Sequence, residues 1–170
     1  MGIRIGVCGA GAFAACFIPL FRAHPLVEEV SIAEVDPGRR EEQARRFGIE
    51  KAYDSLDTLC ESDVDAVALF TQRWLHGPQA VQALRAGKHV YSAVPTAATM
   101  EELRTLVETV QETGLMYMLG ETSYYYPSNV YCRERFRKGD FGRFVVTVQM
   151  VWSSEGGVSP LRCASQAAVR

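Results

Sequence analysis

Three small residues near the start of the chain stand at a spacing that suits a phosphate group. Gly9, Gly11 and Ala14 follow the pattern G-x-G-x-x-(G/A), directly after an apolar run at residues 3–7. The first glycine of such a pattern makes a tight turn, the second leaves room for a pyrophosphate, and the third small residue lets a helix pack closely. The N-terminus of that helix offers N–H groups to phosphate oxygens. We therefore expect a dinucleotide cofactor to be bound by Gly9, Ala10, Gly11, Ala12 and Phe13.

A carboxylate follows the next apolar stretch. Residues 30–35 form a second β-type run that ends at Asp36, and Arg39 and Arg40 follow on a charged helical face that we expect to be solvated. A carboxylate in this place accepts hydrogen bonds from the adenosine ribose and repels a 2′-phosphate, so Asp36 predicts NAD rather than NADP. Glycines also make ordinary turns, and methyltransferases combine a glycine loop with an acidic residue. Both remain open as weaker alternatives on this pattern.

Apolar runs and helical patterns alternate along most of the chain, with short connections between them. The runs that we expect to be strands are residues 3–7, 30–35, 51–53, 66–71, 89–92 and 115–119. Thr99 and Glu102 form a capping box at the start of a fifth helical pattern, which ends at Gly114. Such alternation is typical of parallel sheets covered by helices on both faces. We therefore predict an α/β fold with a doubly wound parallel sheet.

The pattern changes after Gly120. Three tyrosines and Pro127 introduce a helical pattern that runs to Lys138, and residues 144–152 form a β-type run. Residues 153–170 are small and polar and show neither hydrophobic period, so we expect a poorly ordered tail there. We divide the chain into a dinucleotide-binding domain at residues 1–122, the start of a second α/β domain at 123–152, and the tail at 153–170.

Composition narrows the partners of the chain. The 170 residues are 48% hydrophobic with a formal net charge of −2, which favours neither a nucleic-acid surface nor disorder. No apolar run approaches the ~20 residues that span a bilayer, so we expect no membrane partner. The five cysteines form no C-x-x-C pair and no metal-ligand spacing. This pattern predicts no metal site and favours the cytoplasm.

Several stretches together resemble the N-terminal part of the Gfo/Idh/MocA oxidoreductases. They are GVCGAGAFA, AEVDPGRREE, TQRWLHGPQAVQALRAGKHV and RKGDFGRF. The resemblance implies a Rossmann domain that binds NAD or NADP through Gly9, Gly11 and Asp36. It also implies an oxidoreductase acting on a sugar, polyol or related alcohol. In this family the substrate lies against a second α/β domain, and homo-oligomers usually assemble through the open sheet of that domain.

Two family motifs are altered in this chain. Where the family commonly has T-P-N-x-x-H after the fourth strand, only Thr71 and His76 align, and we take both as candidate cofactor contacts. His76 also fits an early helical position where it bonds only locally. Where the family commonly has E-K-P after the fifth strand, this chain has Ala93, Val94 and Pro95. The lysine thought to assist proton transfer is therefore replaced by a side chain that carries no proton.

Glu121 is a candidate catalytic base, because it follows the sixth expected strand at the edge where ligands of open sheets gather. The resemblance places the other catalytic groups on a second domain of which this chain carries only the beginning. We therefore expect a truncated oxidoreductase reduced to its nucleotide-binding part. The alternative is a non-catalytic NAD-binding module or partner subunit.

Overall fold

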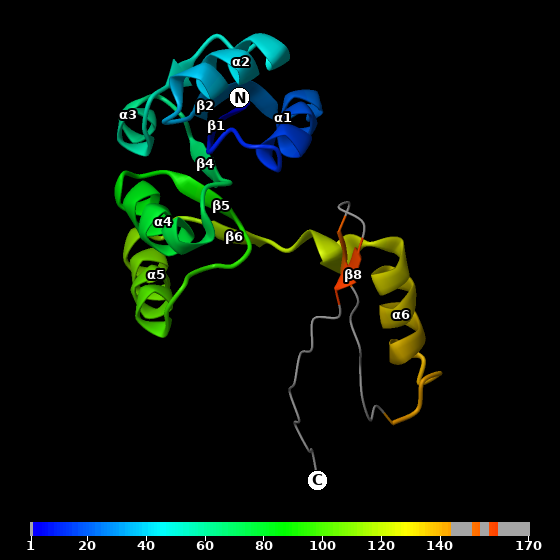
Figure 1. Ribbon diagram of the computed structural model, residues 1–170. Helices are drawn as coiled ribbons and strands as arrows, with labels where there is room; N and C mark the ends of the chain where they lie inside the picture. The colour runs from blue at the N-terminus through cyan, green and yellow to red at the C-terminus, as the bar shows by residue number, and fades with distance from the viewer. Residues whose placement is uncertain (1, 144–150, 154–156, 160–170) are drawn as a thin grey trace. The chain divides into compact units, whose positions relative to one another are not determined.

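The computed structural model describes residues 2–143, 151–153 and 157–159, and every structural statement below concerns these residues. The chain forms two compact units, Met1–Glu121 and Thr122–Arg170. Figure 1 shows the helices and strands of both. The first unit contains the expected dinucleotide-binding fold, and each unit is described by itself.

The first unit is built on a six-stranded sheet in which all neighbouring strands are parallel. Its strands are β1 (Ile3–Cys8), β2 (Val27–Ala33), β3 (Ala52–Tyr53), β4 (Ala66–Leu69), β5 (His89–Ala93) and β6 (Tyr117–Gly120). Their spatial order is β3-β2-β1-β4-β5-β6. The order reverses between β1 and β4, and ligands of such sheets bind outside the carboxyl ends of the strands at this point. The predicted doubly wound fold is confirmed.

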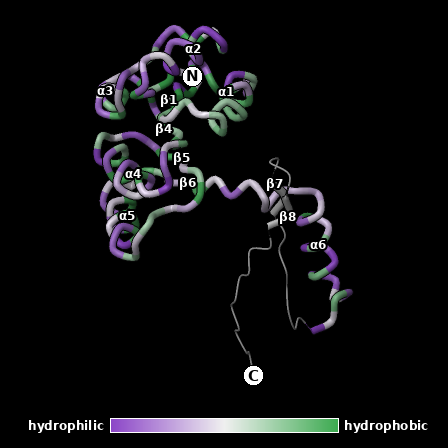
Figure 2. Tube along the Cα trace, viewed as in Figure 1, coloured by the Kyte–Doolittle hydropathy of each residue, from purple (hydrophilic) through white to green (hydrophobic). Residues whose placement is uncertain are grey.

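Five α-helices connect these strands, and their ends follow the capping signals of the sequence. They are α1 (Ala14–Ala23), α2 (Pro37–Phe47), α3 (Leu56–Glu61), α4 (His76–Arg85) and α5 (Met100–Thr113), and a short 3₁₀ helix η1 (Arg73–Leu75) precedes α4. The Thr99 hydroxyl accepts a hydrogen bond from the Glu102 N–H, and Gly114 ends α5 in the left-handed conformation, as predicted. Figure 2 shows that α2 is largely hydrophilic, in keeping with a helix that exposes most of its side chains.

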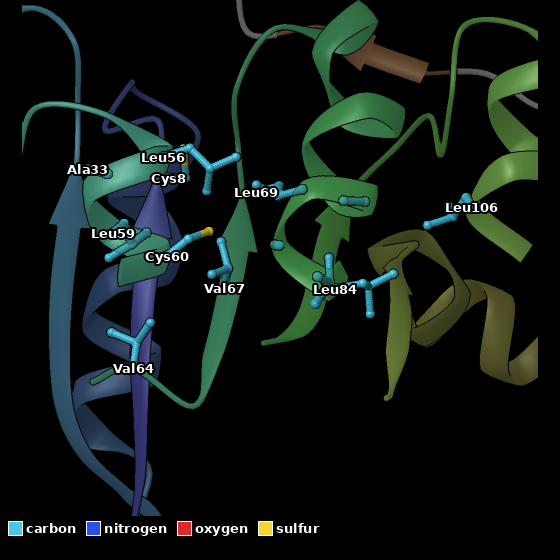
Figure 3. Packing of buried hydrophobic residues seen from close by; sticks show 13 residues of the cluster. Cys8, Ala33, Leu56, Leu59, Cys60, Val64, Val67, Leu69, Leu84 and Leu106 are labelled. Carbon is cyan, nitrogen blue, oxygen red and sulfur yellow. The ribbon is translucent and has the colours of Figure 1, made fainter. Parts of the chain in front are cut away.

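The hydrophobic core lies in two layers, one on each face of the sheet. On one face, Ala14 and Ile18 of α1 are fully buried in a cluster with Val7 of β1. On the other face, α3, α4 and α5 cover the sheet. Figure 3 shows residues of this second layer, among them Cys8, Ala33, Leu56, Leu59, Cys60, Val67, Leu69, Leu84 and Leu106. Burial on both faces makes the sheet a rigid frame for the loops at its carboxyl edge.

Two strands end earlier than their apolar runs predict. β2 begins at Val27 and ends at Ala33, while Val35 is 78% exposed. β2 pairs with β1 along all of β1, up to the pair Cys8 and Ala33, so residues beyond Ala33 have no continuing strand beside them there. β4 likewise ends at Leu69, leaving Thr71 in the loop that follows. The early ends leave Glu34 and Thr71 at the rim of the sheet rather than within strands.

The second unit contains η2 (Thr122–Tyr125), α6 (Pro127–Arg137) and an antiparallel pair, β7 (Val151–Ser153) with β8 (Gly157–Ser159). The helix agrees with the predicted pattern that runs to Lys138. Most of the predicted strand at residues 144–152 lies outside the described residues. β8 lies within residues 153–170, for which we expected little order. Residues 154–156 and 160–170 of that segment lie outside the described part of the chain.

Candidate cofactor-binding site

A cavity of about 230 Å³ opens at the carboxyl ends of β1, β2 and β4, next to the reversal of strand order. Its lining comes from the loop after each strand. These residues include Gly9 and Gly11 after β1, Glu34 and Val35 after β2, and Thr71 and Gln72 after β4. The cavity therefore stands where a doubly wound sheet binds its ligand.

The two glycines of the loop have different structural roles. Gly9 has a φ of +87°, and a Cβ there would lie 2.9 Å from backbone atoms of Phe70 and Thr71. Its N–H donates to the Ala33 carbonyl at 2.8 Å, so the tight turn holds β1 against its neighbours. A Cβ on Gly11, by contrast, would meet nothing within 4 Å. Gly9 is required by the fold, whereas Gly11 leaves open space where a pyrophosphate would lie beside the backbone.

The N-terminus of α1 follows this open space. Phe13 precedes the helix, and within the described residues no side-chain hydrogen bond caps the helix there. The Ala15 and Cys16 N–H groups donate to the Gly11 and Phe13 carbonyls, each at 3.1 Å, so the start of α1 offers an anion mainly the positive end of its dipole. The Phe13 ring packs edge-on against Phe17 and Phe70, with centroid distances of 5.0 and 5.7 Å. These contacts fix the end of the loop, while Ala12 is exposed beside it.

Glu34 is the carboxylate of the cavity, and its side chain is held on both sides. Only 6% of the residue is exposed. Its Oε2 accepts a hydrogen bond from the Ala10 N–H at 2.9 Å, and its Oε1 accepts one from the Asp36 N–H at 3.1 Å. Arg39 Nη1 lies 3.3 Å from Oε1. These partners offset the cost of burying a charge and tie the second strand to the glycine loop.

Asp36, the carboxylate that the sequence pattern selects for the ribose, has a different place in the structure. Its Oδ1 accepts a hydrogen bond from the Arg39 N–H at 2.7 Å, and Pro37 follows as the first residue of α2. Asp36 is thus the N-cap of α2 and is not among the residues that line the cavity. One signal could have separated the two carboxylates, because an Asp-Pro pair is typical of a helix start. Glu34, which directly follows β2, is a cavity-lining carboxylate that the sequence interpretation did not consider, and the ribose role of Asp36 stays a prediction.

Thr71 and His76 lie on different sides of the cavity wall. Thr71 lines the cavity, and its hydroxyl donates to Oε1 of Gln79. His76 is 2% exposed and begins α4 behind this loop. Its Nδ1 is 2.8 Å from the Pro95 carbonyl oxygen, and its Nε2 is 3.1 Å from the Thr71 carbonyl oxygen. Both ring nitrogens therefore face the backbone, and His76 is not among the cavity-lining residues.

The described residues that directly follow β5 and β6 place no proton-transfer group in the lining of this cavity. Val94, which follows β5, is 43% exposed. Glu121 follows β6, is exposed, and donates its N–H to the Leu119 carbonyl at 3.0 Å. Neither residue lines the cavity described above. The role of Glu121 as a base stays a prediction.

Cys8 forms part of the cavity wall next to Glu34. Burial raises the pKa of its thiol to about 12, and the nearby Cys60 and Glu34 add to the rise. A thiol with so high a pKa stays neutral and is a poor nucleophile.

Among the described residues no three His, Cys, Asp or Glu side chains are grouped to hold a metal ion. The same part of the chain has no helix that is long and apolar enough to cross a membrane.

Comparison with known proteins gives relatives across most of the chain. It is 32% identical over 148 residues to 4-carboxy-2-hydroxymuconate-6-semialdehyde dehydrogenase of a Sphingobium species, covering 86% of this chain and 47% of that protein. It is 30% identical over 148 residues to scyllo-inositol 2-dehydrogenase (NAD(+)) of Bacillus subtilis, covering 83% of this chain and 42% of that protein. The chain thus spans less than half the length of these relatives.

Solved structures agree with the fold. The WlbA dehydrogenase of Bordetella pertussis, in complex with NADH and UDP-GlcNAcA, matches with a TM-score of 0.79 and 26% identity, covering 84% of this chain and 44% of that one. The model of the Gfo/Idh/MocA family, described as an oxidoreductase family with an NAD-binding Rossmann fold, matches residues 3–121. This match covers nearly the whole first unit, glycine loop and sheet included. The chain belongs to the Gfo/Idh/MocA oxidoreductase family and carries its NAD-binding Rossmann domain.

Proposed function

We propose that the protein is an NAD-dependent oxidoreductase of a sugar, polyol or related alcohol, and that this chain supplies its cofactor-binding half. The observation that carries the proposal is the buried Glu34 carboxylate, which lies beside the open space over Gly11 at the reversal of strand order. An anion site next to a fixed carboxylate suits a pyrophosphate joined to a ribose. Two relatives, a semialdehyde dehydrogenase and an inositol dehydrogenase, support the reaction class.

In this proposal Glu34, rather than Asp36, binds the adenosine ribose. Glu34 lines the cavity with its carboxylate held by the Ala10 and Asp36 N–H groups, whereas Asp36 does not line the cavity and caps α2. The same carboxylate favours NAD over NADP, because a 2′-phosphate would be placed against a buried negative charge. Arg39 does not reverse this preference, since its guanidinium is already paired with Glu34.

NAD, when bound, supplies the hydride acceptor, and the protein orients it and handles the proton of the substrate hydroxyl. The residues of this chain account for the first part. Gly11 would leave room for the pyrophosphate beside the N-terminus of α1, and Glu34 would bind the ribose. Glu121 is the candidate base that we retain for the proton, at the carboxyl end of β6. The substrate itself is expected to contact residues beyond this domain.

A second function, a non-catalytic NAD-binding module or partner subunit, is favoured by one residue. Val94 stands where the family commonly has lysine, and its side chain neither donates nor accepts a proton. General acid or base groups contribute about 10²- to 10⁴-fold each, so their loss brings turnover close to the uncatalysed rate. A module of this kind would bind the cofactor without catalysing a reaction.

We also propose a cytoplasmic location and assembly into a homo-oligomer. The four described cysteines Cys8, Cys16, Cys60 and Cys132 are all free, which supports the reducing conditions of the cytoplasm. Assembly into a homo-oligomer through a second-domain sheet remains a prediction from the family resemblance.

One experiment separates the two functions. NAD is titrated into the purified chain by calorimetry, and NADH formation is then followed with a panel of inositols, aldoses and sugar alcohols. Binding together with NADH formation that is lost in Glu121→Gln supports the oxidoreductase and the proposed base. Binding without turnover supports the module. Absence of NAD binding contradicts both.

A further inference from the structure

We infer that His76 is a positioning residue, which fixes the nicotinamide end of the cofactor site through two backbone carbonyls and does not itself touch the cofactor. The inference rests on the proposed NAD site and assigns a role to a residue that the sequence pattern suggested as a direct contact. It is carried by the place of the imidazole ring between the segments that follow β4 and β5.

The ring joins two segments that are far apart in the sequence. Nδ1 lies 2.8 Å from the Pro95 carbonyl oxygen, beyond β5, and Nε2 lies 3.1 Å from the Thr71 carbonyl oxygen, beyond β4. Only 2% of His76 is exposed, so water has little access to the ring. Either neutral tautomer donates one hydrogen bond, and a ring that carries both protons donates two. With both nitrogens facing the backbone, no ring nitrogen is directed at a ligand in the cavity.

The surrounding contacts make this link stiff. The Thr71 side chain bonds to Gln79, one turn further along α4 from His76, so the loop after β4 is held to the helix at two points. The segment after β5 is held in the same way. Glu102 Oε2 accepts a hydrogen bond from the Ala98 N–H at 2.9 Å, close to Pro95 in the sequence. His76 thus couples two loops that are each anchored nearby.

Packing next to the ring leaves little room for the two segments to shift. A Cβ on Gly77 would lie 3.1 Å from the Cβ of Ala97 and 3.1 Å from Oε2 of Glu102. The start of α4 therefore already lies close to the segment after β5. Loss of the His76 hydrogen bonds should loosen the loops by small displacements, and small displacements suffice to weaken a fitted ligand site.

A substitution at His76 should affect the binding of the nicotinamide half of NAD more than the binding of its adenosine half. Glu34 and the glycine loop would hold the adenosine and pyrophosphate on the β1–β2 side, and the ring nitrogens of His76 face the Pro95 and Thr71 carbonyls instead. In the proposed site the nicotinamide would lie on the β4–β5 side of the reversal of strand order. Changes at His76 should therefore reduce the affinity for NAD and leave the affinity for ADP-ribose, which lacks the nicotinamide, nearly unchanged.

The test compares the affinities for NAD and ADP-ribose by calorimetry in His76→Phe, which keeps a ring of similar shape but has no ring nitrogen. We expect NAD affinity to fall about tenfold and ADP-ribose affinity to stay within about twofold of the unmodified chain. His76→Gln, whose amide donates to a carbonyl, should recover part of the NAD affinity. It also serves as the second variant if His76→Phe does not fold.

His89→Phe is the matched control. The His89 ring also bonds to the backbone of a neighbouring segment, because its Nδ1 accepts from the Met116 N–H at 3.0 Å, but it lies at the opposite end of β5. Neither affinity should change in this variant. Equal losses for NAD and ADP-ribose in folded His76→Phe, or no loss for either, overturn the inference. If the unmodified chain binds neither ligand, the proposed function fails instead.

Discussion

The two halves of the carboxyl edge of the sheet differ in what they hold. On the β1–β2 half, the glycine loop and the buried Glu34 form one connected unit, joined by the Ala10 N–H. On the β4–β5 half, His76 ties two loops together, but Val94 replaces the lysine that the family commonly has. One half is equipped to bind an anionic, ribose-containing ligand. The other is equipped to place a ligand but lacks a side chain for proton transfer at Val94.

This difference supports the proposal that cofactor binding and catalysis depend on different parts of the protein. The binding half is local, because Gly9, Glu34 and the start of α1 are positioned by neighbouring strands within the first unit. In the proposed function, proton transfer depends on the candidate base Glu121 and on residues outside this domain. A Rossmann unit can therefore keep its ligand while its reaction changes or disappears.

The largest effect is expected at Gly11. Gly11→Val places a branched side chain in the open space over the loop, where a Cβ meets no protein atom within 4 Å. We expect a normal fold by circular dichroism and a loss of NAD affinity on the order of 100-fold or more. Gly9→Val is the contrasting variant, since its Cβ would press on backbone at 2.9 Å and the chain should unfold more easily. Unchanged NAD affinity in Gly11→Val would contradict the proposal that the β1–β2 half binds NAD.

A second prediction concerns the cysteine beneath the β1–β2 half. Burial raises the pKa of Cys8 to about 12, and it also raises the pKa of Cys60. Cys16 and Cys132 are exposed. At neutral pH iodoacetamide should label Cys8 at least about 100-fold more slowly than the exposed thiols. Site-resolved mass spectrometry measures these rates, and rapid labelling of Cys8 would show that this wall is open to water.

The third prediction separates the two carboxylates after β2. Glu34→Gln should weaken NAD binding by about 1.5 to 3 kcal/mol, the contribution of charge-assisted hydrogen bonds to the ribose. Asp36→Ala should leave NAD affinity within about twofold and lower the free energy of unfolding by about 0.5 to 2 kcal/mol, through loss of the α2 cap. Calorimetry and urea unfolding measure the two effects. Weaker NAD binding in Asp36→Ala together with unchanged NAD binding in Glu34→Gln would instead support Asp36 as the ribose ligand.

The smallest effect is expected at the amino end of the sheet, away from both halves. The Arg4 guanidinium, 2.9 Å from Asp65, lowers the pKa of that carboxyl to about 2 from 3.8. A lowered pKa stabilises the fold above pH 3.8, and this contribution is lost as the pH falls toward 2. Both side chains are partly open to solvent, so screening keeps the contribution of the pair small. Urea midpoints of the unmodified chain and Asp65→Asn should differ slightly at pH 5 and converge in the acid range. A constant difference would contradict the pairing.

The fold was more predictable than the site because it depends on repeated patterns. The apolar runs and the caps at Thr99 and Gly114 each reflect local backbone chemistry, so strand and helix order follow from them. The site depends on which side chain turns inward at a strand end. Asp36 and Glu34 are two residues apart and chemically alike, and only the early end of β2 distinguishes them. The burial of His76 likewise depends on Pro95, a residue that sequence spacing does not bring near it.

The most direct test of this account is the ratio of NAD to NADP affinity for the unmodified chain and for Glu34→Gln, measured by calorimetry under one buffer condition. We predict that the unmodified chain binds NAD at least about tenfold more tightly than NADP, because the buried Glu34 charge repels a 2′-phosphate. The ratio should narrow in Glu34→Gln, where Arg39 is released from its ion pair. Equal or tighter binding of NADP by the unmodified chain would contradict the central role assigned to Glu34.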